Sequence, residues 1–203
     1  MIIIKNNDQI DFMRKAGRVV AETLLLLEDK IKPGITTAEL DKIAEEFITK
    51  HGARPSFKGL YGFPASLCIS VNNQVVHGIP GAYSLQEGDI ISVDCGACLN
   101  GFHGDAARTF PVGNVSQEAQ RLIDVTKDCF FEGIKFAQIG NRLSDISHEI
   151  QKYVEDSGFS VVRDFVGHGI GRSVHEDPEV PNFGRPGRGP KLTAGMVLAI
   201  EPM

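Results

Sequence analysis

The dipeptide Asn100-Gly101 constrains this chain more than any other feature, because it separates two stretches of strand-like sequence. An Asn-Gly pair between such stretches is the strongest short-range signal for a β-hairpin with a two-residue turn. With that turn, Gly96 lies opposite Asp105, and Asp94 lies two positions further along its own strand. The sequence therefore predicts an antiparallel pair of strands on which Asp94 and Asp105 point to the same face.

The two carboxylates on this face would be diagonal neighbours, about 7–8 Å apart at the backbone. Carboxylates that are close together repel each other and lose hydration unless a cation lies between them. A divalent metal ion would supply that cation. Two solvated aspartates on an exposed strand face would give the same pattern, so the pair alone leaves both interpretations open.

Composition excludes several classes of protein. The chain has 203 residues, of which 42% are hydrophobic and 23% charged, as is usual for a globular domain that can bury a core. A net charge of −5 with no basic run argues against nucleic-acid binding. The short apolar runs at positions 2–4 and 24–27 fit neither a targeting signal nor a membrane span. We expect a cytoplasmic protein.

The four cysteines are expected to be free thiols in a reducing compartment, and they are Cys68, Cys95, Cys98 and Cys129. The Cys95-x-x-Cys98 spacing could be half of a redox or zinc motif. It lies on a predicted strand rather than at a helix start, and no second such motif exists. Structural thiols are the favoured interpretation.

Hydrophobic periodicity and capping residues predict alternating helical and extended segments. Helices are expected at 8–30, 36–51, 116–136 and 142–157. Strands are expected at 67–71, 75–77, 159–166 and 196–201 besides the hairpin, with irregular loops at 55–64 and 178–190.

An internal repeat underlies this pattern. Residues 33–52 align with 139–158, so that Gly34 matches Gly140, and residues 85–94 align with 192–201, so that Asp94 matches Glu201. Between these pairs, 75–80 aligns with 173–178. The repeats occur in the same order, which predicts a duplicated α+β unit. A site at the junction of the two halves would draw ligands from both.

The second half contributes His168, which lies between glycines that exclude a helix and allow close backbone approach. A lone histidine is most often a core residue. With Asp94, Asp105 and Glu201, however, it completes a mostly oxygen ligand set, which suits Mn²⁺, Fe²⁺, Co²⁺ or Zn²⁺ in a two-metal hydrolase. The other histidines lack such partners: His51 and His148 are expected on helix surfaces, and His103 could support Asp105 from the same strand face.

Together these motifs make the chain similar to the type I methionine aminopeptidases. The matching segments span almost the whole sequence and are 62–72, 75–80, 87–96, 101–113, 167–171, 174–178 and 199–203. The resemblance implies the family's duplicated "pita-bread" fold, an α+β fold with helices on the outer face of an antiparallel sheet. It would form a single domain, 1–203, with half-repeats at about 8–113 and 116–203. It also implies removal of the initiator methionine from nascent chains whose second residue is small.

The resemblance also assigns roles to residues. It implies two divalent metal ions (Co, Mn, Fe or Zn) bound by Asp94, Asp105, His168 and Glu201. His77 and His175 match the two catalytic histidines that contact the peptide bond and stabilise its tetrahedral intermediate. The pocket for the methionine side chain would be formed by Phe57, Leu60, Tyr61, Phe63, Cys68 and Val174. The expected partners are nascent polypeptide N-termini and possible docking on the ribosome, with no membrane or nucleic acid and with a monomeric state.

The sequence departs from the family pattern in a few places. The family has a further glutamate ligand beyond the EPM motif, whereas this chain stops at Met203. The expectation from the sequence is a C-terminally truncated chain whose second half lacks its last strands. Leu60 stands where an aromatic residue is common. A peptidase of the same fold that acts on X-Pro bonds and a non-catalytic binding module remain as alternatives.

Overall fold

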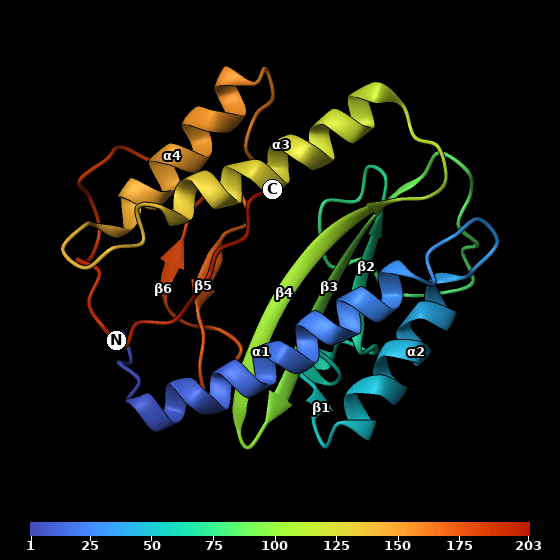
Figure 1. Cartoon of the computed structure of the whole chain (residues 1–203), viewed down its shortest axis with the longest axis horizontal. Helices are drawn as coiled ribbons and strands as arrows, with labels where there is room; N and C mark the ends of the chain where they lie inside the picture. The colour runs from blue at the N-terminus through green and yellow to red at the C-terminus, as the bar shows by residue number, and fades with distance from the viewer. The chain divides into compact units, whose positions relative to one another are not determined.

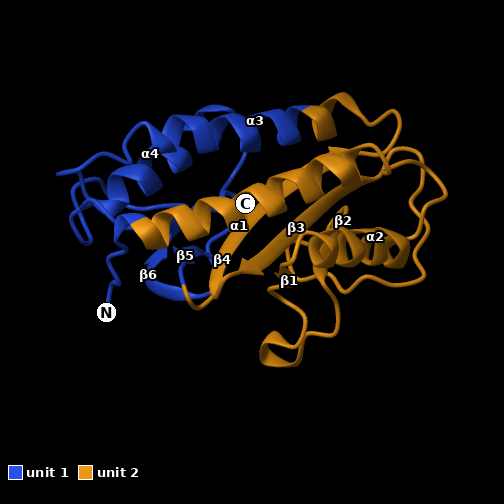
Figure 2. Cartoon of the chain, turned by 60° about the horizontal axis from the view of Figure 1, so that its bottom comes forward, with its two compact units in different colours: residues 1–7, 121–171, 175–203 blue, residues 8–120, 172–174 orange.

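A computed structural model describes all residues, 1–203, and they form two compact units (Figure 1). Unit 2 comprises residues 8–120 and 172–174, and unit 1 comprises residues 1–7, 121–171 and 175–203 (Figure 2). Each unit combines helices with a small antiparallel sheet. No helix is both long enough and apolar enough to cross a membrane.

The sheet of unit 2 is built around β3 (Ile90–Leu99), which pairs along its whole length with β4 (Phe102–Pro111). The other edge of β3 pairs with β2 (Leu67–Val71) and with the short β1 (Arg54–Pro55). At the turn, φ is 53° at Asn100 and 77° at Gly101, and positive φ at both positions is the signature of a type I′ turn. The predicted hairpin and its register are therefore confirmed.

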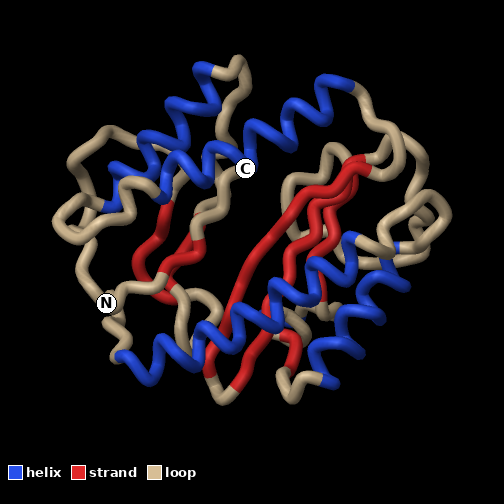
Figure 3. The backbone as a smooth tube through the Cα atoms, in the orientation of Figure 1, coloured by secondary structure: helices blue, strands red, loops and turns tan.

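Two helices cover one face of this sheet, α1 (Asn7–Glu28) and α2 (Thr37–Lys50), with α1 crossing the strands (Figure 3). The start of α2 is fixed by a capping box, in which Thr36 and Glu39 each satisfy a backbone N–H of the other. The apolar faces of both helices bury against β2 and β3 in one core, which includes Val20, Leu24, Leu27, Leu40, Ile48, Leu67, Ile91 and Val93. This packing rather than helix propensity stabilises the layers.

Gly104 allows β4 to approach α1 closely, and this contact gives a testable prediction. A Cβ atom at position 104 would lie 2.6 Å from the backbone nitrogen of Gly17. Backbone cannot move aside as a flexible side chain can, so Gly104→Ala should lower the free energy of unfolding by about 1–3 kcal/mol, the usual cost of overpacking. Urea denaturation measures this. Gly17→Ala is the control, because its Cβ would meet nothing within 4 Å. It should be neutral or stabilising by up to about 1 kcal/mol, and equal effects of the two substitutions would contradict this packing.

Unit 1 contains most of α3 (Gln117–Ile134), all of α4 (Leu143–Asp156) and a three-stranded sheet. The central strand β5 (Gly167–Gly169) pairs with β6 (Glu176–Val180) and β7 (Leu198–Ala199). Its core includes Cys129, Leu143, Ile146, Ile150, Val154, Val161, Val180 and Leu192.

Two predicted strands are wrong. Residues 159–166 are irregular and the strand begins only at Gly167. Phe159 and Val161 nevertheless pack on the core, as the side chains of a buried strand would. The segment does not pair with another strand, however, so hydrophobicity alone gave the wrong assignment. The segment 75–77 is also irregular, and His77 has φ of 59°, which a strand cannot accommodate. In addition, β1 and a short 3₁₀ helix (Leu60–Gly62) occupy the expected loop 55–64, and β6 extends into 178–190.

The internal duplication is confirmed in backbone detail. The helices α2 and α4 have 14 residues each and start at equivalent positions of the repeat. Gly34 and Gly140 precede them with φ of 95° and 96°. The Gly34 amide donates to Leu85 O at 2.8 Å, and the Gly140 amide donates to Leu192 O at 3.1 Å. Each unit thus uses the same loop-to-helix construction.

Candidate metal and peptide site

Asp94 and Asp105 lie on the face of the β3–β4 hairpin that is turned away from the helices. Asp94 pairs with Ala107, and Gly96 pairs with Asp105. Side chains alternate along a strand, and the neighbouring positions face the helices: Cys95 is fully buried in the core and Gly104 contacts α1. The structure therefore places the two carboxylates on one face, as diagonal neighbours.

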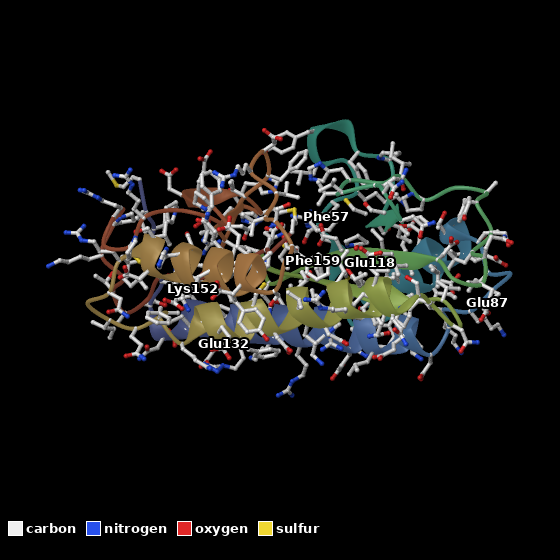
Figure 4. The ribbon with its side chains drawn as sticks, turned by 90° about the horizontal axis from the view of Figure 1, so that it is seen from above. Phe57, Glu87, Glu118, Glu132, Lys152 and Phe159 are labelled. Atoms are coloured by element: carbon white, nitrogen blue, oxygen red, sulfur yellow. The ribbon has the colours of Figure 1, made fainter.

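An apolar cluster lies beside this acidic pair. Phe57, Cys68 and Val174 are buried together, and Leu60 and Phe63 pack against them. The cluster adjoins the aspartates because Cys68 pairs with Asp94 across the sheet. A Cβ atom at position 96 would lie 2.7 Å from the Phe57 ring, so glycine is needed between the carboxylates for the ring to fit. Phe57 is labelled in Figure 4.

Five of the six predicted pocket residues are thus brought together, and Tyr61 is not among them. Its side chain is 87% exposed and lies outside the apolar cluster. The backbone at Tyr61 is left-handed (φ 50°, ψ 27°), between Gly59 and Gly62, which also have positive φ. This backbone conformation turns the Tyr61 side chain out of the cluster. The pattern of hydrophobic residues in the sequence does not reveal it.

His103 occupies the buried end of the same strand face as Asp105. Its Nδ1 lies 2.8 Å from the Ser56 hydroxyl, and the Ser56 amide donates to Gly96 O at 2.9 Å. His103 therefore supports the segment that carries Phe57.

His77 is held against β2 by the residue that follows it. The Gly78 amide donates to Ser70 Oγ at 3.1 Å, and the Ile69 amide donates to Gly78 O at 2.8 Å. No Cβ atom fits at position 78, because it would lie 2.0 Å from Ile69 O. Glycine at position 78 is therefore required for the loop to hold His77 beside β2.

Asp89 holds both ends of the loop that bears His77. Its carboxylate accepts hydrogen bonds from the Asn72 side chain at 2.8 Å, the Tyr83 hydroxyl at 2.8 Å and the Gln86 amide at 2.9 Å. Burial alone would raise the pKa of Asp89, but these three hydrogen bonds outweigh it and hold the pKa below its usual value. Sequence reasoning missed this residue, because no pattern in the sequence joins it to Asn72 and Tyr83, which lie 17 and 6 positions away.

Asp89→Asn should therefore destabilise the fold in a pH-dependent way. The amide cannot accept all three hydrogen bonds, so we expect a loss of about 1–3 kcal/mol in the free energy of unfolding at pH 7. Because the folded pKa lies below the unfolded one, the carboxylate stabilises the fold fully above about pH 4 and loses this effect as the pH falls through the folded pKa. Urea denaturation at several pH values tests this. A difference between wild type and variant that did not shrink in acid would contradict the assignment.

In unit 1, His168 and Glu201 face each other. His168 is buried on β5, and its Nε2 lies 3.1 Å from Glu201 Oε1. Its Nδ1 lies 2.9 Å from Gly169 O, a carbonyl that can only accept, so Nδ1 carries a proton. If the His168 ring is neutral, its Nε2 carries a lone pair that faces a lone pair of the Glu201 carboxylate oxygen. A cation bound by both atoms would accept both lone pairs. This donor set fits a metal ion.

The glycines around His168 let the strands approach closely, as predicted. A Cβ atom would lie 2.3 Å from Ala199 O at position 167, and 2.1 Å from Asp177 O at position 169. Buried Asn182 donates from Nδ2 to the backbone carbonyl of Glu201 at 2.7 Å and so fixes the ligand's main chain. No sequence pattern had singled out Asn182.

His175 completes this group. Its ring centroid lies 4.6 Å from that of His168, with the two planes at 86°. The remaining histidines lie elsewhere: His51 Nδ1 contacts Phe47 O at 2.8 Å, and His148 Nδ1 contacts Gly184 O at 3.2 Å. Each unit thus presents two of the four predicted ligands. No set of three or more His, Cys, Asp or Glu side chains arranged for a metal occurs within either unit.

The four cysteines form no disulfide. All four are free and buried, as expected. Burial raises the pKa of Cys95 strongly, with the negative charges of Asp94 and Asp105 adding to the effect, and raises that of Cys129 to about 12. Thiols in this state are poor nucleophiles, so the structure gives no support to the redox interpretation of Cys95-x-x-Cys98.

Comparison with known proteins agrees with these features. The sequence profile described as "Metallopeptidase family M24" matches residues 11–203. A methionine aminopeptidase from Clostridium perfringens is 75% identical over the whole chain, which covers 82% of that protein, and methionine aminopeptidase 1 from Bacillus subtilis is 57% identical with the same coverage. A crystal structure of methionine aminopeptidase from Rickettsia prowazekii superposes with a TM-score of 0.98 at 43% identity, with 100% of this chain and 82% of that chain covered.

A prolidase from Pyrococcus horikoshii also superposes, with a TM-score of 0.86 at 23% identity over 100% of this chain and 56% of that one, which shows a shared fold alone. The architecture is the α+β "pita-bread" fold expected from the sequence. The chain therefore belongs to metallopeptidase family M24 and is a metalloaminopeptidase.

Proposed function

We propose that this chain removes N-terminal methionine from peptides with a small second residue, using divalent metal ions bound by Asp94, Asp105, His168 and Glu201. The observation that carries the proposal is the pairing of His168 Nε2 with Glu201 Oε1, at 3.1 Å, in a ring whose other nitrogen is committed to Gly169 O. The acidic pair of the hairpin supplies the other two ligands.

The chemistry of the ligand set favours Mn²⁺, Fe²⁺, Co²⁺ or Zn²⁺, because it combines three carboxylates with one imidazole. When bound, a pair of such ions lowers the pKa of a water molecule and polarises the scissile carbonyl. The aspartates on β3 and β4 are well suited to hold ions, because they project from a rigid, fully paired hairpin.

The apolar cluster of unit 2 is the proposed pocket for the methionine side chain. Phe57 and Phe63 provide aromatic surface and Cys68 provides a small polarisable group, both of which suit a flexible thioether. The pairing of Cys68 with Asp94 would keep this side chain next to the metal ligands. The free amine of the substrate would bind at the carboxylate-rich side, which accounts for cleavage at the N-terminus.

The histidines would act on the peptide bond. His175 would donate a hydrogen bond to the oxyanion that develops on the scissile carbonyl, and His77 would contact the same peptide. Glu201 or one of these histidines would deliver the proton to the leaving nitrogen. We further propose that the protein acts in the cytoplasm, as a monomer, on nascent chains, with docking on the ribosome as one way of meeting them.

A panel of short peptides tests the proposal. With added Mn²⁺ or Co²⁺, Met-Ala-Ser should be hydrolysed at least about 10-fold faster, in kcat/KM, than Leu-Ala-Ser, because the pocket discriminates by shape. Met-Trp-Ser should be a poor substrate. Faster cleavage of Ala-Pro than of Met-Ala-Ser would favour an X-Pro peptidase. A folded, metal-loaded chain that cleaves none of the peptides would favour a binding module.

A further inference from the structure

Among the ion pairs made by Lys and Arg side chains, one pair in unit 1 differs from the others in burial. Lys5 Nζ lies 2.6 Å from Glu176 Oε2, and the two side chains are only 3% and 5% exposed. The Lys152–Asp156 pair on α4 is typical of the others, at 59% and 70% exposed (Lys152 is labelled in Figure 4). Burying two charges costs several kcal/mol per ion, and a packed apolar pair is often as stable or more stable. The pair therefore needs an explanation other than stability.

The surroundings of Lys5 show that its position is closely defined. Its amide donates to Gly195 O at 2.8 Å, and its Nζ also donates to Ile3 O at 2.9 Å. Two glycines make room for it. A Cβ atom at position 171 would lie 2.6 Å from Lys5 Cε, and one at position 195 would lie 2.6 Å from Lys5 O. The N-terminal segment is thus built into unit 1.

Glu176 connects this segment to the histidines. It directly follows His175, and it pairs with Gly169, the residue that directly follows His168. That pairing contains an irregularity, because the register shifts between His168 and Gly169. At a register shift, ladder hydrogen bonds fix the strands less well, so a buried side-chain contact at Glu176 can define where the two rings meet.

We propose that the buried Lys5–Glu176 ion pair is a positioning element, which fixes the turn bearing His175 and so holds its ring perpendicular to that of His168. Lys5 and Glu176 touch no substrate in this scheme and act through His175. The inference rests on the proposed function, in which His175 stabilises the oxyanion. It predicts that loss of the pair misplaces His175 even where the fold is intact.

The experiment separates positioning from stability through a double variant. Lys5→Met and Glu176→Met each remove one member of the buried ion pair and are expected to lower the urea midpoint. Lys5→Met/Glu176→Met removes both charges at similar volume and should restore the midpoint to about that of the wild type. Lys152→Met is the matched control, because it breaks an exposed ion pair of the same unit.

In the double variant, kcat for Met-Ala-Ser should fall by about 10–100-fold while KM and the Mn²⁺ affinity stay within about 3-fold, as expected for loss of orientation rather than of a ligand. The ¹H–¹⁵N signals of the His175 imidazole should move, whereas in Lys152→Met they and kcat should match the wild type. Wild-type kcat and wild-type His175 signals in the double variant would overturn the inference.

The imidazole spectra need no turnover, so the two proposals can fail separately. If the wild-type chain does not hydrolyse Met-Ala-Ser, the proposed function fails, and the spectra still decide whether the ion pair positions His175. If the single variants fail to fold, the double variant decides alone.

Discussion

We expect Asp105→Ala to abolish stoichiometric binding of Mn²⁺ while the helices stay folded. The substitution removes one of the two carboxylates on the hairpin face. Even substitutions of residues that only hydrogen-bond to a metal ligand lower metal affinity by about 10–100-fold. We therefore expect affinity to fall by more than about 100-fold. Calorimetric titration with Mn²⁺ measures it, and far-UV circular dichroism verifies the helices.

Asp29→Ala is the matched control for this prediction, because Asp29 is an exposed carboxylate in the same unit, just after α1. It should bind Mn²⁺ as the wild type does. Stoichiometric, tight metal binding by the Asp105 variant would remove the hairpin pair from the proposed site.

We expect His175→Ala to lower kcat for Met-Ala-Ser by about 100–1,000-fold, the usual cost of removing one donor to an oxyanion. Its metal content should remain that of the wild type, because His175 is not among the proposed ligands. Steady-state kinetics together with metal analysis of the purified protein test both statements.

His148→Ala provides the comparison, since His148 lies on α4 and contacts Gly184 O rather than the histidine pair. It should keep wild-type kcat. A His175 variant that retained more than half of the wild-type kcat would show that this ring does not stabilise the transition state.

Local signals allowed much of the fold to be predicted. The Asn100-Gly101 turn fixes its own geometry, and from it the register that places Asp94 and Asp105 on one face. The glycines and the apolar positions of α2 recur in α4, so the duplication was visible in the sequence. Turns and helix ends are determined mainly by residues that are close together in the sequence, which is why the sequence alone reveals them.

The structure differs from the sequence predictions, or adds to them, for several separate physical reasons. Residues 159–166 have the hydrophobicity of a strand but pack on the core without pairing. Tyr61 has the residue type of a pocket wall, yet its left-handed backbone exposes it. Lys5 and Glu176 are 171 positions apart, and no pattern in the sequence joins them.

The most direct test of the account is the release of free methionine from Met-Ala-Ser by metal-stripped protein as Mn²⁺ is titrated in. We expect no release in the absence of metal, a rise as the proposed sites at Asp94, Asp105, His168 and Glu201 fill, and loss of activity when a chelator is added. Release of methionine that persists in excess chelator, or a fully metal-loaded protein that releases none, would contradict it.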